Sequence, residues 1–439
     1  MTILLMLSLF ILSLSLVGLL LKKEEDIFFI LMTVVFSVTW VADELMLLPH
    51  FFTWSIELLI FLLFVIFLLP KCIFFRKIET TPIFKYLFFI IIYGIIGSVI
   101  YAVSFDSILL GLRSYFKYAF LFLIFINAGI SPKKYKKLFF CWLAIIGIQP
   151  IVGLFQALFL GKTDDAVHGT ITDTGILSML LIIFIICLID LIKRNTINNY
   201  ILYFFIFLSF TVIPIFGEVK AFFYFLPFIL AIRYFNVILS FQMQKIIIFL
   251  IPFIISVLLF QNFYGFDVFE LSQINTSDFL FSQGKNSVTG DSNSLAISLS
   301  ERFLSLLATY NFLSNDLLRI FFGEGLGSHV FTYETRENFI LNTQESYILK
   351  FSISKFIANM GVVGLALFCI MLAKISYYAY QSSFIIKNEF FINIYRTIPA
   401  FSILFCLSMV YTDPFEDYIQ FSYWFFVSSI AYIPSLEKL

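Results

Sequence analysis

Residues 174–192 read TGILSMLLIIFIICLIDLI, and this stretch decides the fold class because it is almost entirely apolar. A helix needs about 20 apolar residues to cross the hydrocarbon core of a bilayer, which is roughly 30 Å thick. Comparable stretches recur along the chain, and together they predict about 13 transmembrane helices. The expected spans are 2–21, 27–43, 51–69, 86–104, 114–130, 138–160, 174–192, 200–216, 219–236, 246–260, 356–376, 393–411 and 416–433.

The composition supports an all-α polytopic integral membrane protein. Hydrophobic residues make up 61% of the 439 residues and charged residues only 13%, whereas soluble domains carry about 25% charged residues. The long apolar runs favour helices over barrel strands. We expect one transmembrane domain over residues 1–439. Residues 1–21 lack the features of a cleaved signal peptide and are expected to stay as the first span.

The segments that connect the spans alternate in charge. One set includes Lys22, 133–137 and Lys438, and it holds most of the 28 basic residues and few of the 28 acidic ones. The positive-inside rule places this set, with the C-terminus, in the cytoplasm. The other set includes residues 261–355, which therefore form one large extracytoplasmic loop within the domain.

The large loop is expected to contain short amphipathic helices. Ser300–Ser314 places Phe303, Leu306, Leu307 and Tyr310 on one face at helical spacing. Such a helix would lie at the membrane interface or pack under the loop.

A glycine run follows at residues 322–328, FGEGLGS. It lacks the preceding strand and the Lys-Ser/Thr ending of a phosphate loop. The glycines instead favour a tight turn that returns the loop towards the bilayer.

Several cations are expected on the same side as the large loop. Guanidinium groups suit phosphates because their planar fork matches paired oxygens and keeps its charge. Cations within an apolar span need a partner or a water-filled cavity. The alternative is that these groups are solvated or contact lipid headgroups. The candidates for binding a lipid-linked pyrophosphate are Arg113, Arg302, Arg319, Arg336, Lys117 and Lys220.

The acidic residues and histidines allow fewer assignments. Most acids on this side, including Glu44 and Glu57, are expected to be solvated, and Glu218 could simply neutralise Lys220. A single histidine is more often structural than catalytic. The sequence has no Asp-x-Asp motif, so it gives no support to a metal site for nucleotide sugars.

The order of these features resembles the O-antigen polymerase family (Wzy type), within the O-antigen polymerase and ligase superfamily. The resemblance rests on an Arg-bearing helix, the glycine run, a Glu-Ser-Tyr triplet, a glycine-containing span and an Arg that opens a middle span. These are Arg302, 322–328, Glu345–Tyr347, Gly361–Gly364 and Arg113. Residues 217–221, GEVKA, lie where the family often has Ser-Arg-Gly, so Lys220 is a departure.

The resemblance implies metal-independent, inverting glycosyl transfer without a cofactor, at the outer face of the bacterial inner membrane. Donor and acceptor would be undecaprenyl-pyrophosphate-linked glycans, with a chain-length regulator as a further partner and no role for nucleic acid. Glu345 would orient or deprotonate the acceptor hydroxyl, with His168 and His329 as further candidates for the catalytic base.

Two alternatives remain open. An O-antigen ligase would transfer the glycan to lipid A-core, but its pattern has a histidine near the position of Glu345, and no histidine occurs between residues 330 and 439. A flippase for lipid-linked sugars would more often show paired half-repeats, which this chain does not display.

Overall fold

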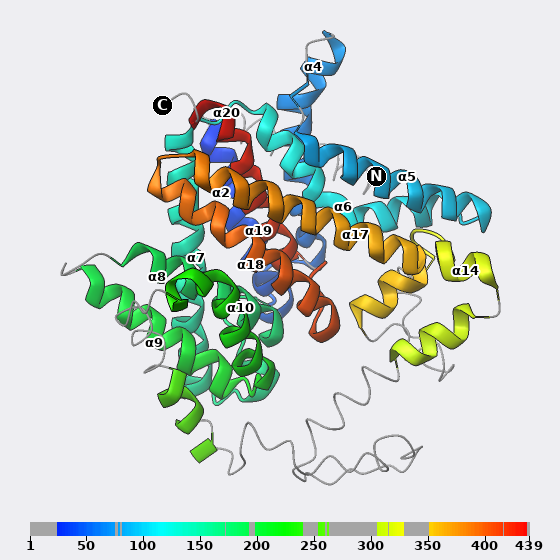
Figure 1. The fold of residues 1–439 in the computed structure, drawn as a ribbon. Helices are drawn as coiled ribbons and strands as arrows, with labels where there is room; N and C mark the ends of the chain where they lie inside the picture. Colours follow the sequence, from blue (N-terminus) through cyan, green and yellow to red (C-terminus); the bar gives the residue numbers. More distant parts are fainter. Residues whose placement is uncertain are drawn as a thin grey trace, which may run out of the picture.

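The computed structural model describes residues 24–74, 78–79, 81–171, 173–192, 198–239, 253–259, 261–262, 305–314, 316–328, 351–415 and 417–436. Within these ranges the chain is mostly helical and forms no strand. Figure 1 shows most of the helices gathered into one bundle. The expected fold class, an all-α membrane protein with several apolar helices, is therefore confirmed.

The helices vary in length from one turn to nine. The longer ones are α2 (Glu24–Val35), α3 (Ser55–Leu63), α5 (Pro82–Ile100), α6 (Phe105–Asn127), α7 (Pro132–Phe159), α8 (Thr174–Leu191), α9 (Asn198–Phe216), α10 (Lys220–Leu239), α17 (Ser352–Ile385), α18 (Glu389–Tyr411) and α19 (Asp417–Ser428). The shorter ones are η1 (Trp40–Glu44), η2 (His50–Trp54), η3 (Phe64–Leu68), α4 (Leu69–Ile73), η4 (Asp164–Ala166), α14 (Leu317–Phe322), η5 (Ser429–Tyr432) and α20 (Ile433–Leu436).

Among the described residues, eight helical segments are long and apolar enough to cross a membrane. They cover 50–73, 82–100, 105–127, 132–159, 174–191, 199–216, 352–385 and 389–411. The expected count of about 13 is not confirmed. The expected span 2–21 and most of 246–260 lie outside the described residues.

Three other expected spans form helices that are not among the eight. Helix α2 has 12 residues, and at 1.5 Å per residue it is about 18 Å long, shorter than the bilayer core. Helix α19 also has 12 residues, but η5 and α20 continue it without a gap to Leu436. Helix α10 has 20 residues, but Tyr234 adopts a non-helical conformation within it (φ −109°, ψ 19°). Whether these three segments cross the membrane stays a prediction.

Local sequence signals set where several helices begin. The side chains of Ser104, Ser131, Asp173 and Asn388 accept backbone N–H groups at the starts of α6, α7, α8 and α18. These caps satisfy N–H groups that have no partner within the helix. Pro132 opens α7, where its missing N–H costs nothing.

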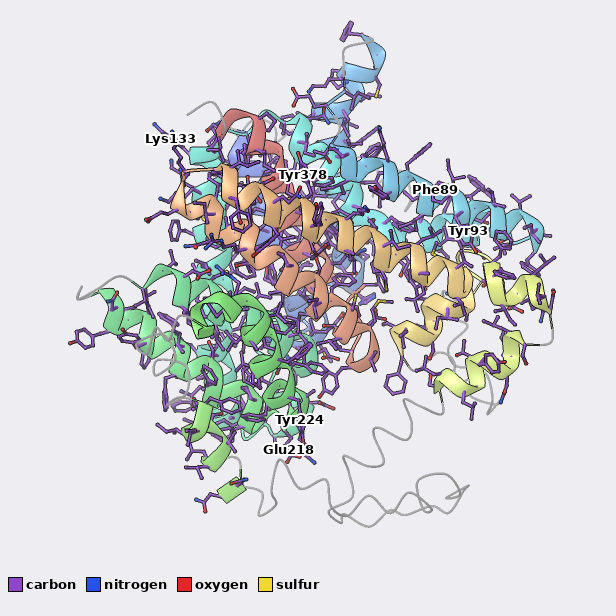
Figure 2. All side chains as sticks on the ribbon, in the orientation of Figure 1. Phe89, Tyr93, Lys133, Glu218, Tyr224 and Tyr378 are labelled. Carbon is purple, nitrogen blue, oxygen red and sulfur yellow. The ribbon has the colours of Figure 1, made fainter. Side chains whose placement is uncertain are left out.

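Helix α8 lies at the centre of the packing, with nearly every side chain from Ile176 to Ile189 buried. It packs against α7, α9, α10 and α18, while α17 runs along α18 and crosses α5 (Figure 1). Figure 2 places Lys133, at the start of α7, and Glu218, before α10, at opposite ends of the bundle. A basic residue therefore lies at one end of the bundle and an acidic residue at the other.

The expected amphipathic helix in the large loop is only partly described. Residues 305–313 are helical, but the buried positions are Ser305, Thr309 and Leu313, whereas Leu307 and Tyr310 are exposed. Ser305 Oγ donates to Ser354 Oγ at 2.7 Å, which ties this helix to α17. Small polar side chains allow this close approach. Because Leu307 and Tyr310 face outward, this helix does not pack under the loop through them, and the membrane-interface alternative stays a prediction. Phe303 lies outside the described residues.

Candidate functional site

Two cations on α6 converge on one carboxylate of α3. Arg113 donates to Glu57 Oε1 through Nε at 2.9 Å and Nη2 at 2.7 Å. Lys117 donates to the same oxygen at 3.3 Å. The two cations are four residues apart and so share one face of α6. These three residues, Arg113, Lys117 and Glu57, are called the cation cluster below, and they comprise two cations and one carboxylate.

Burial gives the cation cluster an inner and an outer part. The side chain of Lys117 is 14% exposed and that of Arg113 is 42% exposed. The Trp54 ring lies under the Arg113 guanidinium, 5.3 Å from its carbon to the ring centroid. Among the described residues, Nη1 of Arg113 makes no hydrogen bond. The guanidinium is thus held on two sides and can still bind an anion.

Residues 40–57 connect the cation cluster to a second polar group. Glu44, at the end of η1, accepts a hydrogen bond from Lys162 Nζ at 2.9 Å and also pairs with His168 Nε2. Asp43 pairs with His50 Nδ1 at 2.6 Å within the same segment. The expectation that most acids on this side are solvated is therefore wrong for Glu44 and Glu57, because distant cations fold back onto them.

The loop between α7 and α8 holds His168 rigidly. Gln156 forms two hydrogen bonds with the backbone of Gly169, both at 2.8 Å. Thr170 Oγ1 donates to the carbonyl of Phe36 at 2.6 Å. These contacts attach the loop to α7 and to the residues that follow α2, and they fix the position of the imidazole ring.

The environment of His168 favours the neutral ring. Burial lowers the pKa of His168 from its ordinary value of 6.5, and the charge of Lys162 lowers it further, although Glu44 opposes them. The Nδ1 atom is buried and makes no hydrogen bond with the described residues. Because neither nitrogen faces open space, this geometry suits a structural role, and a role as base would require the loop to move.

The glycine run packs as backbone against two neighbouring helices. Gly325 and Gly327 have φ values of +98° and +90°. A Cβ on Gly325 would lie 2.7 Å from the Cα of Ser98, and one on Gly327 only 1.8 Å from the carbonyl oxygen of Ser107. Any side chain at either position would collide with backbone, so glycine is required by packing as well as by φ.

The same run connects α17 to α6. Helix α17 is interrupted at Gly361, where φ is +69°. Just before it, Asn359 accepts a hydrogen bond from Gly327 N at 3.1 Å and donates to Tyr115 Oη at 3.0 Å. A Cβ on Gly111 would lie 2.6 Å from Gly327 N. The glycine run therefore lies against α6 two residues before Arg113.

The backbone amides of the glycine run are used within the protein. Glu324 N donates to the Ala358 carbonyl at 2.8 Å, and Leu326 N donates to Ser98 Oγ at 2.7 Å. A phosphate cradle needs amides that point at a ligand. This arrangement agrees with the interpretation of the run as a turn.

The other described cations do not join the cation cluster. Arg319, on α14, pairs with Glu324 at 3.3 Å and lies 5.9 Å from the ring centroid of Tyr101. Lys220 is the first residue of α10 and interacts electrostatically with Glu218. Arg302, Arg336, Glu345 and His329 lie outside the described residues. Their assigned roles therefore stay predictions.

Glu57 of the cation cluster and Trp54, which lies against Arg113, were not singled out from the sequence as site residues. Glu57 is the acid inside the apolar run 51–69, and Trp54 lies one helical turn before it. A buried acid in such a run signals a paired cation, but the sequence alone does not say which one. Among the described residues, no group of three side chains of His, Cys, Asp or Glu is placed to hold a metal ion. No protein-family model and no curated protein matches this chain.

Proposed function

We propose that this protein polymerises undecaprenyl-pyrophosphate-linked oligosaccharide repeat units, as in O-antigen or capsular polysaccharide, by metal-independent, inverting glycosyl transfer. The resemblance of its motif order to the O-antigen polymerase family suggests the reaction. The cation cluster on α6 is the observation that carries the proposal.

The cation cluster has the properties that a lipid pyrophosphate requires. It combines two cations with one carboxylate, it has an Arg113 guanidinium with one donor edge available, and its cations lie inside the apolar helix α6. A pyrophosphate bound there would keep its polyprenyl tail in the bilayer. The glycine run, which belongs to the large loop, packs at Gly111 beside it, and this contact would bring the loop over the bound donor.

In the proposed reaction, the acceptor hydroxyl attacks the anomeric carbon of the donor, and the bond from that carbon to the pyrophosphate oxygen breaks. Arg113 would stabilise the charge that develops on the leaving pyrophosphate, an effect worth about 3–4 kcal/mol per donor in comparable sites. Arg302 would assist it, and Glu345 would accept the proton of the hydroxyl. The last two roles come from the resemblance.

The charge pattern supports an orientation in the bacterial inner membrane with the large loop outside and the C-terminus in the cytoplasm. This orientation would expose the cation cluster to repeat units already moved to the outer leaflet. A chain-length regulator would be a natural partner there.

Deletion of the gene in its own strain tests the class of reaction. Loss of a polymerase leaves single repeat units attached to the final acceptor, which gel electrophoresis of the surface glycan detects. Loss of a ligase removes even these single units, and loss of a flippase leaves precursors in the cytoplasmic leaflet. Either of the latter two results would contradict the proposal.

Complementation of the deletion strain then tests the residues. We expect Arg113→Ala and Arg302→Ala to restore no length ladder, whereas Arg396→Ala, an exposed cation on α18, should restore it. Immunoblots of membranes should show equal protein levels. An unchanged ladder with either of the first two variants would remove that residue from the pyrophosphate site.

A further inference from the structure

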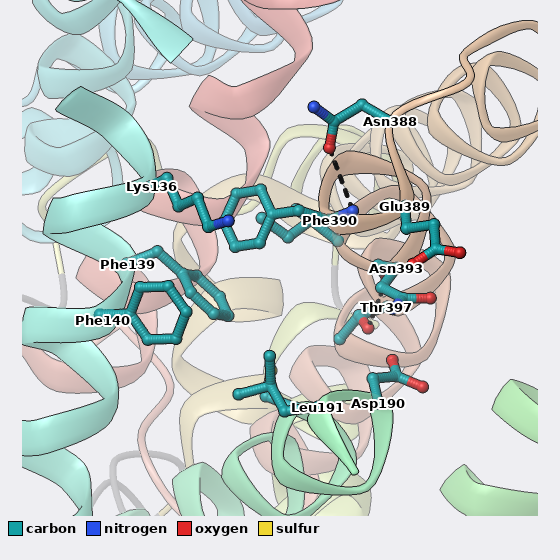
Figure 3. Close-up of a pocket in the computed structure, with 12 residues that line it drawn as sticks. Lys136, Phe139, Phe140, Asp190, Leu191, Asn388, Glu389, Phe390, Asn393 and Thr397 are labelled. Carbon is teal, nitrogen blue, oxygen red and sulfur yellow. Dashed lines mark hydrogen bonds between the residues drawn. The ribbon is translucent and has the colours of Figure 1, made fainter. Parts of the chain in front are cut away.

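A cavity lies among the start of α7, the end of α8 and the start of α18 (Figure 3). Its volume is about 460 Å³, within the range of small-molecule sites. All three helices are candidate membrane spans, and in a bilayer their ends would lie at the level of the lipid headgroups. The cavity includes Asn388, before α18, and Thr397, eight residues into it, which places its deeper part about 12 Å along the helix.

The inner part of the cavity carries a charge that is already neutralised. Asp190 pairs with Arg233 at 2.6 Å and accepts a hydrogen bond from Tyr234 Oη at 2.9 Å. The side chains of Asp190 and Arg233 are 8% and 6% exposed. A ligand therefore meets no net charge at this depth.

The outer part carries one cation and one anion on opposite walls. Figure 3 shows Lys136 on α7 across the cavity from Glu389 on α18. The two lie too far apart for an ion pair, and neither forms one elsewhere in the described part of the chain. Lys136 Nζ lies 5.3 Å from the ring centroid of Phe390 and 6.0 Å from that of Phe140. The walls are thus apolar between two charges of opposite sign.

We infer that this cavity binds the headgroup of a phospholipid that carries a primary ammonium, the ethanolamine class. The phosphate would contact Lys136, the ammonium would donate to Glu389 and the amide of Asn393, and the first methylenes would lie on the phenylalanine rings. A zwitterion matches the two opposite charges, whereas a headgroup whose only charge is its phosphate would leave Glu389 without a counter-charge. A choline group has no N–H to donate, and Lys136 already occupies the ring faces that would attract it.

Native mass spectrometry of the full-length protein, released from nanodiscs, tests this inference. The probes are dioleoyl phosphatidylethanolamine, phosphatidylcholine and phosphatidylglycerol, each supplied in turn. We expect the protein to retain one molecule of phosphatidylethanolamine and to bind it about tenfold more tightly than either of the other two lipids.

Four variants locate the site. Glu389→Gln should abolish the preference for the ethanolamine lipid, Lys136→Met should weaken binding, and Asn393→Phe should fill the cavity and prevent binding. Lys133→Met, an exposed lysine on the same helix that does not line the cavity, should bind as the wild type does. Equal retention of all three lipids, or wild-type binding by Glu389→Gln and Asn393→Phe, would overturn the inference. Size-exclusion profiles confirm that each variant is folded.

Discussion

Replacement of Gly327 by Ala tests whether the glycine run is fixed to α6. An L-residue at φ +90° costs about 1–2 kcal/mol in backbone energy. The added Cβ would also lie 1.8 Å from the carbonyl oxygen of Ser107. Because that oxygen is backbone, no rotamer change relieves the contact, and overpacking of this kind costs about 1–3 kcal/mol more. The expected loss of stability is therefore about 2–5 kcal/mol.

Gly129→Ala is the matched control. Gly129 also has a positive φ, +66°, but a Cβ there would meet no atom within 4 Å. Its replacement should cost only the backbone term of about 1–2 kcal/mol. Unfolding of the purified protein in detergent, followed by intrinsic fluorescence, compares the two variants. If both lose the same stability, the contact between the glycine run and α6 does not exist as described.

Three further predictions concern other described residues. The pKa of His168 is lowered chiefly by burial. The stabilisation from the neutral, buried imidazole is therefore complete above pH 6.5 and is lost as pH falls through the lowered pKa. His168→Gln should flatten the fall in melting temperature between pH 7 and pH 5, and an equal fall for the variant and the wild type would refute this. Asp190→Asn leaves the buried Arg233 without a counter-charge and should cost about 3–5 kcal/mol of unfolding free energy. The double replacement Asp190→Leu with Arg233→Met should recover most of this free energy. Equal stability of the single and double variants would argue against the ion pair. Trp54→Ala removes the ring under Arg113, worth about 0.5–1 kcal/mol, and should raise the KM for the lipid-linked donor a few-fold without changing kcat; an unchanged KM would count against the stacking.

The apolar runs predict the helices well where one run coincides with one uninterrupted helix. Residues 174–192 form α8, and 393–411 lie within α18. The expectation is less accurate where a local feature interrupts the helix. Tyr234 breaks α10, and the segment 27–43 divides into α2 and η1. Hydropathy measures transfer into lipid, and it does not detect the backbone change that ends a helix.

The candidate site was predictable only in part. A charge inside an apolar span indicates a functional or paired group, and from the sequence this rule favours Arg113 and Lys220, with Lys117 as a further candidate. Lys220 lies at the start of α10 and interacts with Glu218 instead. Arg113 and Lys117 come together on one carboxylate. Their shared partner, Glu57, is 56 residues before Arg113, and no local pattern connects them. The role of the glycine run also depends on distant residues, since Ser98 and Ser107 determine why no side chain fits there.

The most direct test is transfer by the purified protein in nanodiscs, with a synthetic undecaprenyl-pyrophosphate-linked repeat unit as donor and acceptor. We predict lipid-linked products of two or more units and release of undecaprenyl pyrophosphate in the presence of a metal chelator. Arg113→Ala should lose this activity, while Arg396→Ala should keep it. If the wild-type protein elongates no repeat unit, the proposed function is contradicted. If Arg113→Ala elongates as fully as the wild type, the role of the cation cluster is contradicted.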